Sequence, residues 1–164
     1  AIGFGPIAAH LLKQWPVEKF IELGQQLVQR YNARILLFGG PQEVQAVTRI
    51  AAQIPNAPIV LCGKLSLLES AAAIRRCAVV VGNDTGTIHI AAAMKRNVVA
   101  IFGPTVEEFG YYPYQTRALV ISKTLPCRPC THTGKGLCKI KTHACMQTIT
   151  TAEVFQAVET MLKA

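Results

Sequence analysis

The stretch that decides the fold runs from Ala78 to Thr105 and reads AVVVGNDTGTIHIAAAMKRNVVAIFGPT. Three valines from Val79 to Val81 predict a buried strand, and the residues from Gly82 to Gly86 predict a tight turn. An alanine-rich helix and a second apolar strand, Val98 to Phe102, follow. In such a unit the unpaired N–H groups of the helix start point beyond the carboxyl end of the strand, where anions bind in open parallel sheets. The turn is therefore predicted to bind phosphate.

The alternation of strand and helix continues on both sides of this stretch. Further strands are expected at residues 2–4, 35–38, 59–62 and 118–121, and further helices at 17–31, 41–52, 66–76 and 151–162. Two Ser/Thr-x-x-Glu patterns, Ser66 to Glu69 and Thr150 to Glu153, predict capping boxes at the starts of two of these helices. This pattern predicts an α/β fold with a mostly parallel sheet.

Length and composition predict one domain. The chain has 164 residues, of which 51% are hydrophobic, enough for one substantial core and not comfortably for two. We therefore expect a single domain over residues 1–164. No apolar run approaches the roughly 18 residues that a membrane-spanning helix needs, so a soluble domain is expected. The chain begins at Ala1 without an initiator methionine, which fits a piece of a longer protein.

The charge of the chain predicts an anionic partner. The formal net charge is +8, and the segment between Glu108 and Glu153 contains six Lys or Arg residues and no Asp or Glu. Nucleic acid, anionic lipid and phosphorylated ligands would all be attracted to such a surface. Nucleic acid is the minority interpretation, because no basic block is interleaved with aromatic residues. A basic surface that serves solubility alone is an equally valid interpretation.

The segment 125–148 departs from the pattern because it is polar, basic and rich in cysteine. Four thiols so close in sequence could hold a structural zinc ion, namely Cys127, Cys130, Cys138 and Cys145. Only the first two have the tight C-x-x-C spacing, so a disulfide, a remote iron–sulfur option and reduced packing cysteines remain as alternatives. Cys62 and Cys77 are expected to be ordinary buried thiols.

Several ordered motifs give the chain a family resemblance. They are Lys13-x-Trp15-Pro16, Gly39-Gly40-Pro41-x-Glu43, Leu65-Ser66-Leu67-x-Glu69, Gly82-Asn83-Asp84-Thr85-Gly86-x-x-His89-x-Ala91-Ala92-Ala93 and Phe102-Gly103-Pro104-Thr105. Together they resemble the heptosyltransferases of glycosyltransferase family 9. The resemblance covers nearly the whole chain, including the cysteine-rich segment, and corresponds to the carboxyl-terminal half of those enzymes.

The resemblance implies a fold and a set of site residues. It implies a Rossmann-like three-layer α/β/α domain that forms one half of a two-domain GT-B glycosyltransferase and binds the nucleotide-sugar donor. The donor-binding residues it implies are Lys13, Glu43, Leu65, Asp84, Thr85, Gly86, Thr87 and His89. It places no catalytic residue in this chain, because the general base and the acceptor site belong to an amino-terminal domain absent from these residues. Alone, the domain is expected to bind the donor without transferring the sugar.

The chemistry of these residues suits the implied roles. Negative charge builds on the departing diphosphate, so the N–H groups of Thr85, Gly86 and Thr87 and the Thr85 hydroxyl could stabilise it. A side chain at position 86 would hold the phosphates away. By resemblance, Lys13 contacts phosphate, Glu43 binds the ribose hydroxyls, Leu65 meets the adenine, Asp84 contacts the donor sugar, and His89 lies at the donor site.

Each of these residues also has an ordinary structural interpretation. Lys13 could be a solvated surface lysine, and Leu65 a core residue. Glu43 could serve as a first-turn acid that complements the helix dipole. Asp84 could cap the following helix, and His89 could be a buried histidine bonded to a carbonyl.

The function expected is that of the donor-binding domain of an inverting glycosyltransferase in lipopolysaccharide or other cell-envelope polysaccharide biosynthesis, with ADP-heptose as donor. No divalent metal is expected to be needed for catalysis, because the helix start and Lys13 would neutralise the phosphates. The resemblance also implies a lipid-linked saccharide acceptor and a cytoplasmic location with peripheral association at the inner membrane. A zinc-stabilised module that binds nucleic acid through residues 117–141, and a scaffold without nucleotide affinity, are the alternatives.

Overall fold

Six strands form one sheet at the centre of the computed structural model, which describes residues 1–163. The sheet order is β3-β2-β1-β4-β5-β6, and all five pairings among the described residues are parallel. The strands are β1 (Ile2–Gly5), β2 (Ile35–Leu37), β3 (Ile59–Val60), β4 (Val79–Asn83), β5 (Asn97–Ile101) and β6 (Ala118–Ile121). The expected α/β fold is therefore confirmed, with the strand order of the doubly wound Rossmann fold.

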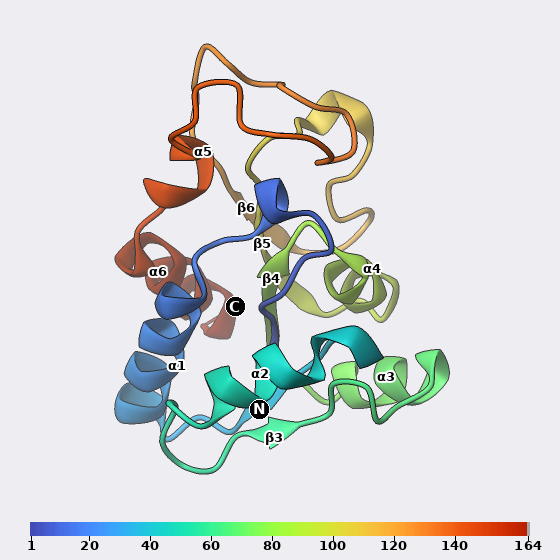
Figure 1. Ribbon diagram of the computed structural model, residues 1–164. Coiled ribbons are helices and arrows are strands. Elements are labelled where there is room, and N and C mark those ends of the chain that lie inside the picture. The colour runs from blue at the N-terminus through green and yellow to red at the C-terminus, as the bar shows by residue number, and fades with distance from the viewer. Residues whose placement is uncertain (164) are drawn as a thin grey trace.

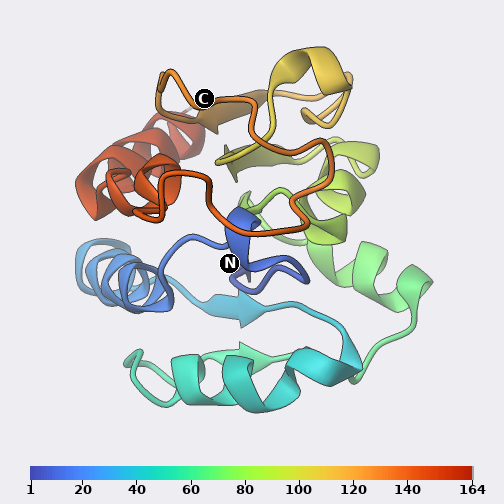
Figure 2. The ribbon, with the colours of Figure 1, turned by 45° about the horizontal axis from the view of Figure 1, so that its top comes forward.

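Helices cover both faces of the sheet, as Figures 1 and 2 show. One face is covered by α1 (Val17–Tyr31), α2 (Val44–Ala51) and α6 (Thr151–Leu162), whose apolar residues share a core cluster with the strands. The other face is covered by α3 (Leu67–Ile74) and α4 (Gly86–Ala93), which contribute to a second cluster. Short helices interrupt the connections: η1 (Leu11–Lys13), η2 (Pro41–Glu43), η3 (Glu107–Phe109) and α5 (Ala144–Gln147).

The central strand β4 shows why the sheet lies between two helix layers. Val79 and Val81 point into the first core cluster, whereas Val80 points into the second, because side chains alternate along a strand. All five residues of β4 are buried. A strand buried on both faces needs a continuous apolar run, which is what the sequence supplies.

Both predicted capping boxes are present. The Ser66 Oγ accepts from the Glu69 N–H at 3.3 Å, while the Glu69 carboxylate accepts from the Ser66 N–H at 2.8 Å. Thr150 and Glu153 make the same exchange at 3.2 and 2.8 Å at the start of α6. These reciprocal bonds satisfy two otherwise unpaired N–H groups at each helix start.

Several element boundaries differ from the sequence predictions. The strand expected at 59–62 contains only Ile59 and Val60, because the chain turns at the edge of the sheet. The helix expected at 41–52 starts as the 3-10 turn η2 and continues as α2 to Ala51. Helix α3 ends at Ile74 rather than near residue 76, and the strand β5 is shifted by one residue. The short helix α5 was not expected.

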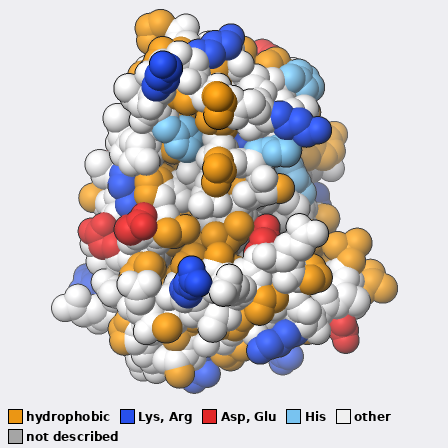
Figure 3. Space-filling view, viewed as in Figure 1, with side chains coloured by type: hydrophobic (Ala, Val, Ile, Leu, Met, Phe, Trp, Pro, Cys, Tyr) orange, Lys and Arg blue, Asp and Glu red, His pale blue; other side chains and the backbone are white. Residues whose placement is uncertain are grey.

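The residues 125–148, called here the cysteine loop, cross the carboxyl edge of the sheet above η1 in Figure 1. Figure 3 shows the histidines over this upper half of the molecule, whereas Lys and Arg side chains are spread over both halves of the face. The loop itself contributes four Lys or Arg residues and no Asp or Glu. Among residues 1–163, no helix is long and apolar enough to cross a bilayer.

The Asn83 side chain ties three segments together at the end of β4. Its Nδ2 donates to the Pro6 carbonyl at 2.9 Å, and its Oδ1 accepts from the Trp15 N–H at 3.0 Å. The Trp15 indole N–H in turn donates to the Ile149 carbonyl at 3.0 Å. Asn83 is fully buried, so the amide fixes the loop that follows β1 against the loop that follows β4.

We expect Asn83→Ala to lower the free energy of unfolding by about 2–4 kcal/mol, because it leaves the Pro6 carbonyl and the Trp15 N–H buried without partners. Urea denaturation followed by the fluorescence of Trp15, the single tryptophan, measures the change. Gln25→Ala, which removes one exposed bond to the Gln53 carbonyl, is the control and should cost less than about 0.5 kcal/mol. Equal losses of unfolding free energy in the two variants would show that the buried Asn83 bonds contribute no more to stability than one exposed side-chain bond.

Candidate functional site

The candidate site lies where the strand order reverses, between β1 and β4. The loops that leave the carboxyl ends of these two strands carry Lys13 and the turn from Asp84 to Gly86. Ligands of open parallel α/β sheets bind in the crevice outside this switch point, since the two loops diverge there. The fold therefore places the predicted phosphate-binding turn at the expected position.

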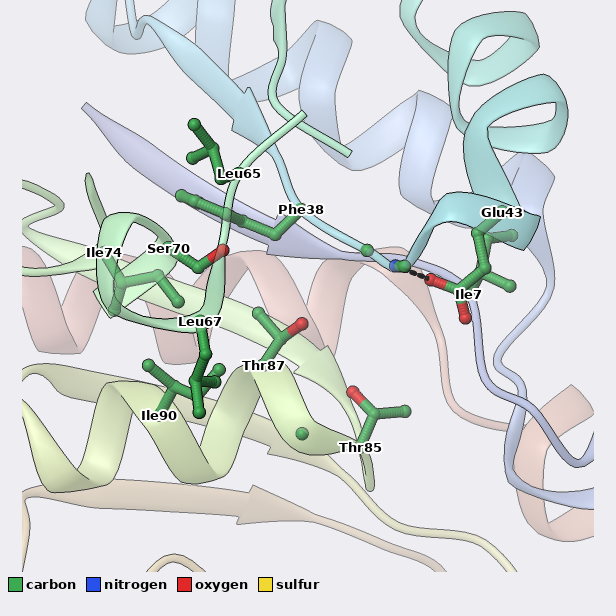
Figure 4. Close-up of a pocket in the computed structure, with 13 residues that line it drawn as sticks. Ile7, Phe38, Glu43, Leu65, Leu67, Ser70, Ile74, Thr85, Thr87 and Ile90 are labelled. Atoms are coloured by element: carbon green, nitrogen blue, oxygen red, sulfur yellow. Dashed lines mark hydrogen bonds between the residues drawn. The ribbon is translucent and has the colours of Figure 1, made fainter. Parts of the chain in front are cut away.

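A pocket of about 340 Å³ opens beside this turn (Figure 4). Five of the eight predicted donor-binding residues line it, namely Glu43, Leu65, Thr85, Gly86 and Thr87. Figure 4 shows Glu43 and Ile7 at one end, Leu65 and Phe38 at the other, and the two threonines along the α4 side. The pocket thus joins an acidic end, an apolar end and a helix start.

The start of α4 carries no cap from a side chain. Thr85 occupies the N-cap position in an extended conformation, but its side chain makes no capping bond. Its Oγ1 is buried and has no partner among the described residues. Nothing lies within 4 Å of the position that a Cβ would take on Gly86. The N–H groups of this turn therefore lack a side-chain cap and the buried Thr85 hydroxyl lacks a partner, and such a helix start favours an anion.

Glu43 lies across the pocket from this turn. Its Oε2 accepts from the Gly40 N–H at 2.8 Å, and Gly39 packs closely against the same carboxylate. The structural interpretation of Glu43 as a first-turn acid is thus confirmed, and the residue lines the pocket as well. The second carboxylate oxygen makes no bond to any residue from 1 to 163.

Leu65 is half-buried at the apolar end of the pocket and belongs to neither core cluster. Its interpretation as a core residue is therefore wrong. Phe38, which the sequence reasoning assigned only to a strand, forms the wall next to Leu65. Together they offer an apolar surface on which a flat ring can lie.

Lys13 and Asp84 form a buried ion pair next to the pocket. The Lys13 Nζ lies 2.6 Å from the Asp84 Oδ2, and the two side chains are 11% and 3% exposed. The Thr105 hydroxyl donates to the same carboxylate oxygen at 3.1 Å. The interpretation of Lys13 as a solvated surface lysine is wrong, and so is that of Asp84 as a helix cap, because Thr85 holds the N-cap position.

His89 lies one turn into α4 on the open side of the ion pair. Its Nε2 is 3.8 Å from the Asp84 Oδ1, and its side chain is 44% exposed. It makes no hydrogen bond to a carbonyl within residues 1–163, so the interpretation as a buried structural histidine is wrong. Its imidazole is therefore open to solvent, although His89 is not among the residues that line the pocket.

Asp84 is held as a carboxylate by its surroundings. Burial acts to raise the pKa of Asp84, but the neighbouring His89 imidazole, the bond and charge of Lys13, and the Thr105 hydroxyl together outweigh it. The pKa of Asp84 therefore lies below its ordinary value. At neutral pH Asp84 is therefore a carboxylate, and its contact with the Lys13 Nζ fixes that group beside the helix start.

The sequence reasoning missed two residues that touch Lys13. The Lys13 Nζ lies 4.8 Å from the centroid of the Tyr111 ring, and the Lys13 stem passes against Gly134. Neither residue lies in a periodic segment, so no pattern signalled them. A weak hint was available for Gly134, since a Thr-x-x-Gly step in a polar loop marks a turn.

The cysteine loop shows no metal-binding arrangement among the residues that the structure describes. Within residues 1–163 no group of three or more His, Cys, Asp or Glu is arranged to hold a metal ion, and all six cysteines are free thiols. Cys145 is buried in the core cluster, where burial raises its pKa to about 11, and the Cys138 sulfur accepts from the His143 N–H. The structure therefore gives no support to the zinc site predicted at Cys127, Cys130, Cys138 and Cys145. The interpretation of Cys62 and Cys77 as buried thiols is confirmed.

Residues 1–141 match the family model for glycosyltransferase family 9 (heptosyltransferase). The chain belongs to glycosyltransferase family 9. The resemblance stated from the motifs is thereby confirmed over most of the chain.

Individual members of glycosyltransferase family 9 are similar in sequence and in fold. Lipopolysaccharide heptosyltransferase 2 of Salmonella typhimurium is 33% identical over 113 residues, covering 66% of this chain and 32% of that protein. The structure of E. coli ADP-heptose lps heptosyltransferase II matches with a TM-score of 0.82 and 29% identity, over 99% of this chain and 46% of that chain.

A third match is a complex with a nucleotide-sugar analogue. The structure of E. coli heptosyltransferase WaaC with ADP-2-deoxy-2-fluoro heptose matches with a TM-score of 0.68 and 26% identity, over 97% of this chain and 42% of that chain. The chain thus spans between about a third and a half of the length of these family members.

For this family 9 chain, we expect Asp84→Asn to lower the free energy of unfolding by about 3 kcal/mol at pH 7, because the buried Lys13 ammonium loses its counter-charge. Because the pKa of Asp84 is lowered in the folded state, this stabilisation is present above about pH 4 and is lost as the pH falls through the folded-state pKa. Urea denaturation at pH 7 and pH 3 should therefore show a gap between wild type and variant that narrows in acid. Glu18→Gln, at an exposed position in the first turn of α1, should cost less than about 1 kcal/mol at pH 7, the contribution of an acid at a helix start. A gap between wild type and Asp84→Asn that is independent of pH would contradict the role of the Asp84 charge.

Proposed function

We propose that this chain is the donor-binding half of an inverting glycosyltransferase that uses ADP-heptose in the synthesis of lipopolysaccharide or a related cell-envelope polysaccharide. Three features support the proposal: membership of family 9, a pocket at the switch point of the sheet, and two solved relatives, one named for ADP-heptose and one in complex with its fluorinated analogue. The other half of such an enzyme would supply the acceptor site and the general base.

The observation that carries the proposal is the unpaired hydroxyl of Thr85 at the uncapped start of α4. A buried hydroxyl without a partner is costly and rare in native proteins, so it calls for an explanation. A diphosphate in the pocket would accept from this hydroxyl and from the N–H groups of Gly86 and Thr87. The helix dipole adds a favourable partial charge at the same place.

The same groups would assist the chemical step. In transfer from a nucleotide sugar, the bond between the anomeric carbon and the diphosphate oxygen breaks, and negative charge grows on that oxygen. Donors that are already fixed in place stabilise this charge without reorganising. The Lys13 ammonium, held beside the helix start by Asp84, supplies a full positive charge. His89 at the mouth could donate to the same phosphate group.

The remainder of the pocket fits an adenosine moiety. The unbonded carboxylate oxygen of Glu43 can accept from the two vicinal hydroxyls of a ribose, which are both donors. Leu65 and Phe38 provide the apolar surface against which an adenine ring would lie. The pocket thus offers a helix start for the diphosphate, a carboxylate for the ribose and an apolar wall for the base.

The acceptor and the place of the reaction extend the proposal beyond this chain. We propose that a lipid-linked saccharide is bound by the other half of the protein, at the cytoplasmic face of the inner membrane. The basic surface over the cysteine loop is compatible with an anionic membrane nearby. The rival function, a zinc-stabilised nucleic-acid module, loses its main support because the cysteines are not arranged around a metal.

We expect the purified chain to bind ADP saturably and more tightly than UDP, and Glu43→Ala to weaken ADP binding by roughly tenfold to a hundredfold. The reason is the loss of charge-assisted bonds from the ribose hydroxyls. Calorimetric titration with each nucleotide measures the affinities.

Glu153→Ala is the matched control for this titration. Glu153 accepts from the Thr150 N–H at 2.8 Å in a helix-start arrangement like that of Glu43, but it does not line the pocket. It should therefore lower stability and leave ADP affinity unchanged. Absence of ADP binding in the wild type, or equal loss in both variants, would exclude the proposed donor site.

We expect Thr85→Val to raise the stability of the free chain by about 1 kcal/mol while weakening ADP binding by roughly tenfold. Valine removes a buried hydroxyl that has no partner in the free chain but bonds the diphosphate in the complex. Thermal or urea denaturation and ADP titration measure the two changes. Thr116→Val is the control, because it removes a hydroxyl that donates to the Arg96 carbonyl. It should lower the stability of the free chain and leave ADP affinity unchanged. A Thr85 variant that is less stable and binds ADP normally would contradict this role.

A further inference from the structure

The stem of Lys13 is enclosed by the cysteine loop at Gly134. Gly134 is buried and has a φ of +88°, a conformation that residues with a side chain rarely adopt. A Cβ at this position would lie 2.7 Å from the Lys13 Cγ and 2.8 Å from its Cε. Glycine is thus required twice, once for the turn and once for the close approach of the lysine stem.

The ammonium end of Lys13 is enclosed from another side by Tyr111. The Nζ lies 4.8 Å from the ring centroid, within the range of a cation–π interaction. The Tyr111 hydroxyl is 3.2 Å from the His132 Nδ1, and the His132 ring packs against Phe109 with centroids 4.4 Å apart. The cysteine loop therefore holds the tyrosine that covers the ammonium group.

The cysteine loop is itself fastened to the segments that build the site. The His143 Nε2 lies 2.8 Å from the carbonyl oxygen of Leu12, the residue before Lys13. The Arg128 guanidinium donates to the Thr105 carbonyl at 2.7 Å, and the Cys130 N–H donates to the Pro104 carbonyl at 3.3 Å. These bonds join the loop both to the segment that carries Lys13 and to the threonine that bonds Asp84.

We propose that Tyr111 and Gly134 are positioning residues that hold the Lys13 ammonium beside the start of α4, so that the cysteine loop sets the affinity of the site for a diphosphate. The proposal rests on the proposed donor-binding function. A lysine stem has many rotamers, and fixing them before the ligand arrives removes an entropic cost from binding. The enclosed ammonium group is already ordered before phosphate binds, whereas a free ammonium group would lose conformational entropy on binding.

The first test compares two glycines of the same loop. Gly134→Ala forces a side chain against the Lys13 stem, whereas Gly136→Ala introduces similar backbone strain, at a φ of +101°, where no atom lies within 4 Å. We expect Gly134→Ala to weaken ADP binding by about tenfold and to leave adenosine binding within about twofold, since adenosine lacks the diphosphate. Gly136→Ala should change neither affinity. Equal effects of the two variants on ADP binding would overturn the proposal.

The second test is a double-mutant cycle with Lys13→Met. Tyr111→Leu should weaken ADP binding in the wild-type background and have no further effect in the Lys13→Met background, because the ring acts through the ammonium group. Tyr111→Phe keeps the ring and should retain most of the affinity. Tyr112→Leu, whose ring packs on Phe102 instead, should add independently to Lys13→Met. Additivity of Tyr111→Leu with Lys13→Met would overturn the proposal even if both variants bind weakly.

A measurement without ligand separates failure of this inference from failure of the proposed function. An amine-acylating reagent followed by peptide mass spectrometry reports the accessibility of Lys13, and we expect acylation to be several-fold faster in Gly134→Ala and unchanged in Gly136→Ala. If the wild type binds ADP but the two variants acylate and bind alike, the positioning role is excluded and the donor site stands. If the wild type does not bind ADP, the donor site is excluded and the claim about diphosphate affinity falls with it.

Discussion

The buried ion pair of Lys13 and Asp84 is the constraint on which the arrangement of the site depends. Two charges can leave water only if each gains a close counter-charge and further polar partners, since desolvation otherwise costs more than their attraction returns. The chain meets this demand by bringing three loops to one point: the loop after β1 carries Lys13, the loop after β4 carries Asp84, and the loop after β5 carries Thr105. The Asn83 amide, bonded to Pro6 and Trp15, fixes the first two loops against each other.

The ion pair also explains why no side chain caps the start of α4. An aspartate just before a helix ordinarily accepts from the first N–H groups of that helix. Here the carboxylate turns to Lys13, because a buried ammonium group is a stronger partner than a backbone N–H. Thr85 takes the N-cap position without making a capping bond, and the N–H groups remain available. The ion pair and the uncapped start of α4 thus both follow from the bond between Asp84 and Lys13.

The sequence predicted the strands and helices well because their signals are local. The apolar run at Val79, the capping box at Ser66 and the spacing of apolar residues along α1 each act within a few residues, and the structure confirms them. It also predicted that Thr85 and Gly86 lie in the turn between a buried strand and a helix, and the structure places them there. Tyr111 and Gly134 were missed because their importance comes from packing against Lys13, about 100 and 120 residues away in sequence, and irregular loops carry no periodic signal for such contacts.

The cysteine loop has a composition that suggests a metal site, but hydrogen bonds to neighbouring segments hold it in place. Four cysteines suggested a metal, yet the loop is fastened by ordinary polar contacts: His143 to the Leu12 carbonyl, Arg128 to the Thr105 carbonyl and the Cys130 N–H to the Pro104 carbonyl. Every one of these acceptors lies in a segment that builds the ion pair. A shift of this loop would break these bonds or move Lys13 or Thr105, so its conformation is coupled to that of the ion pair. The cysteine loop is therefore part of the structural frame of the ion pair, although it is the most irregular part of the fold.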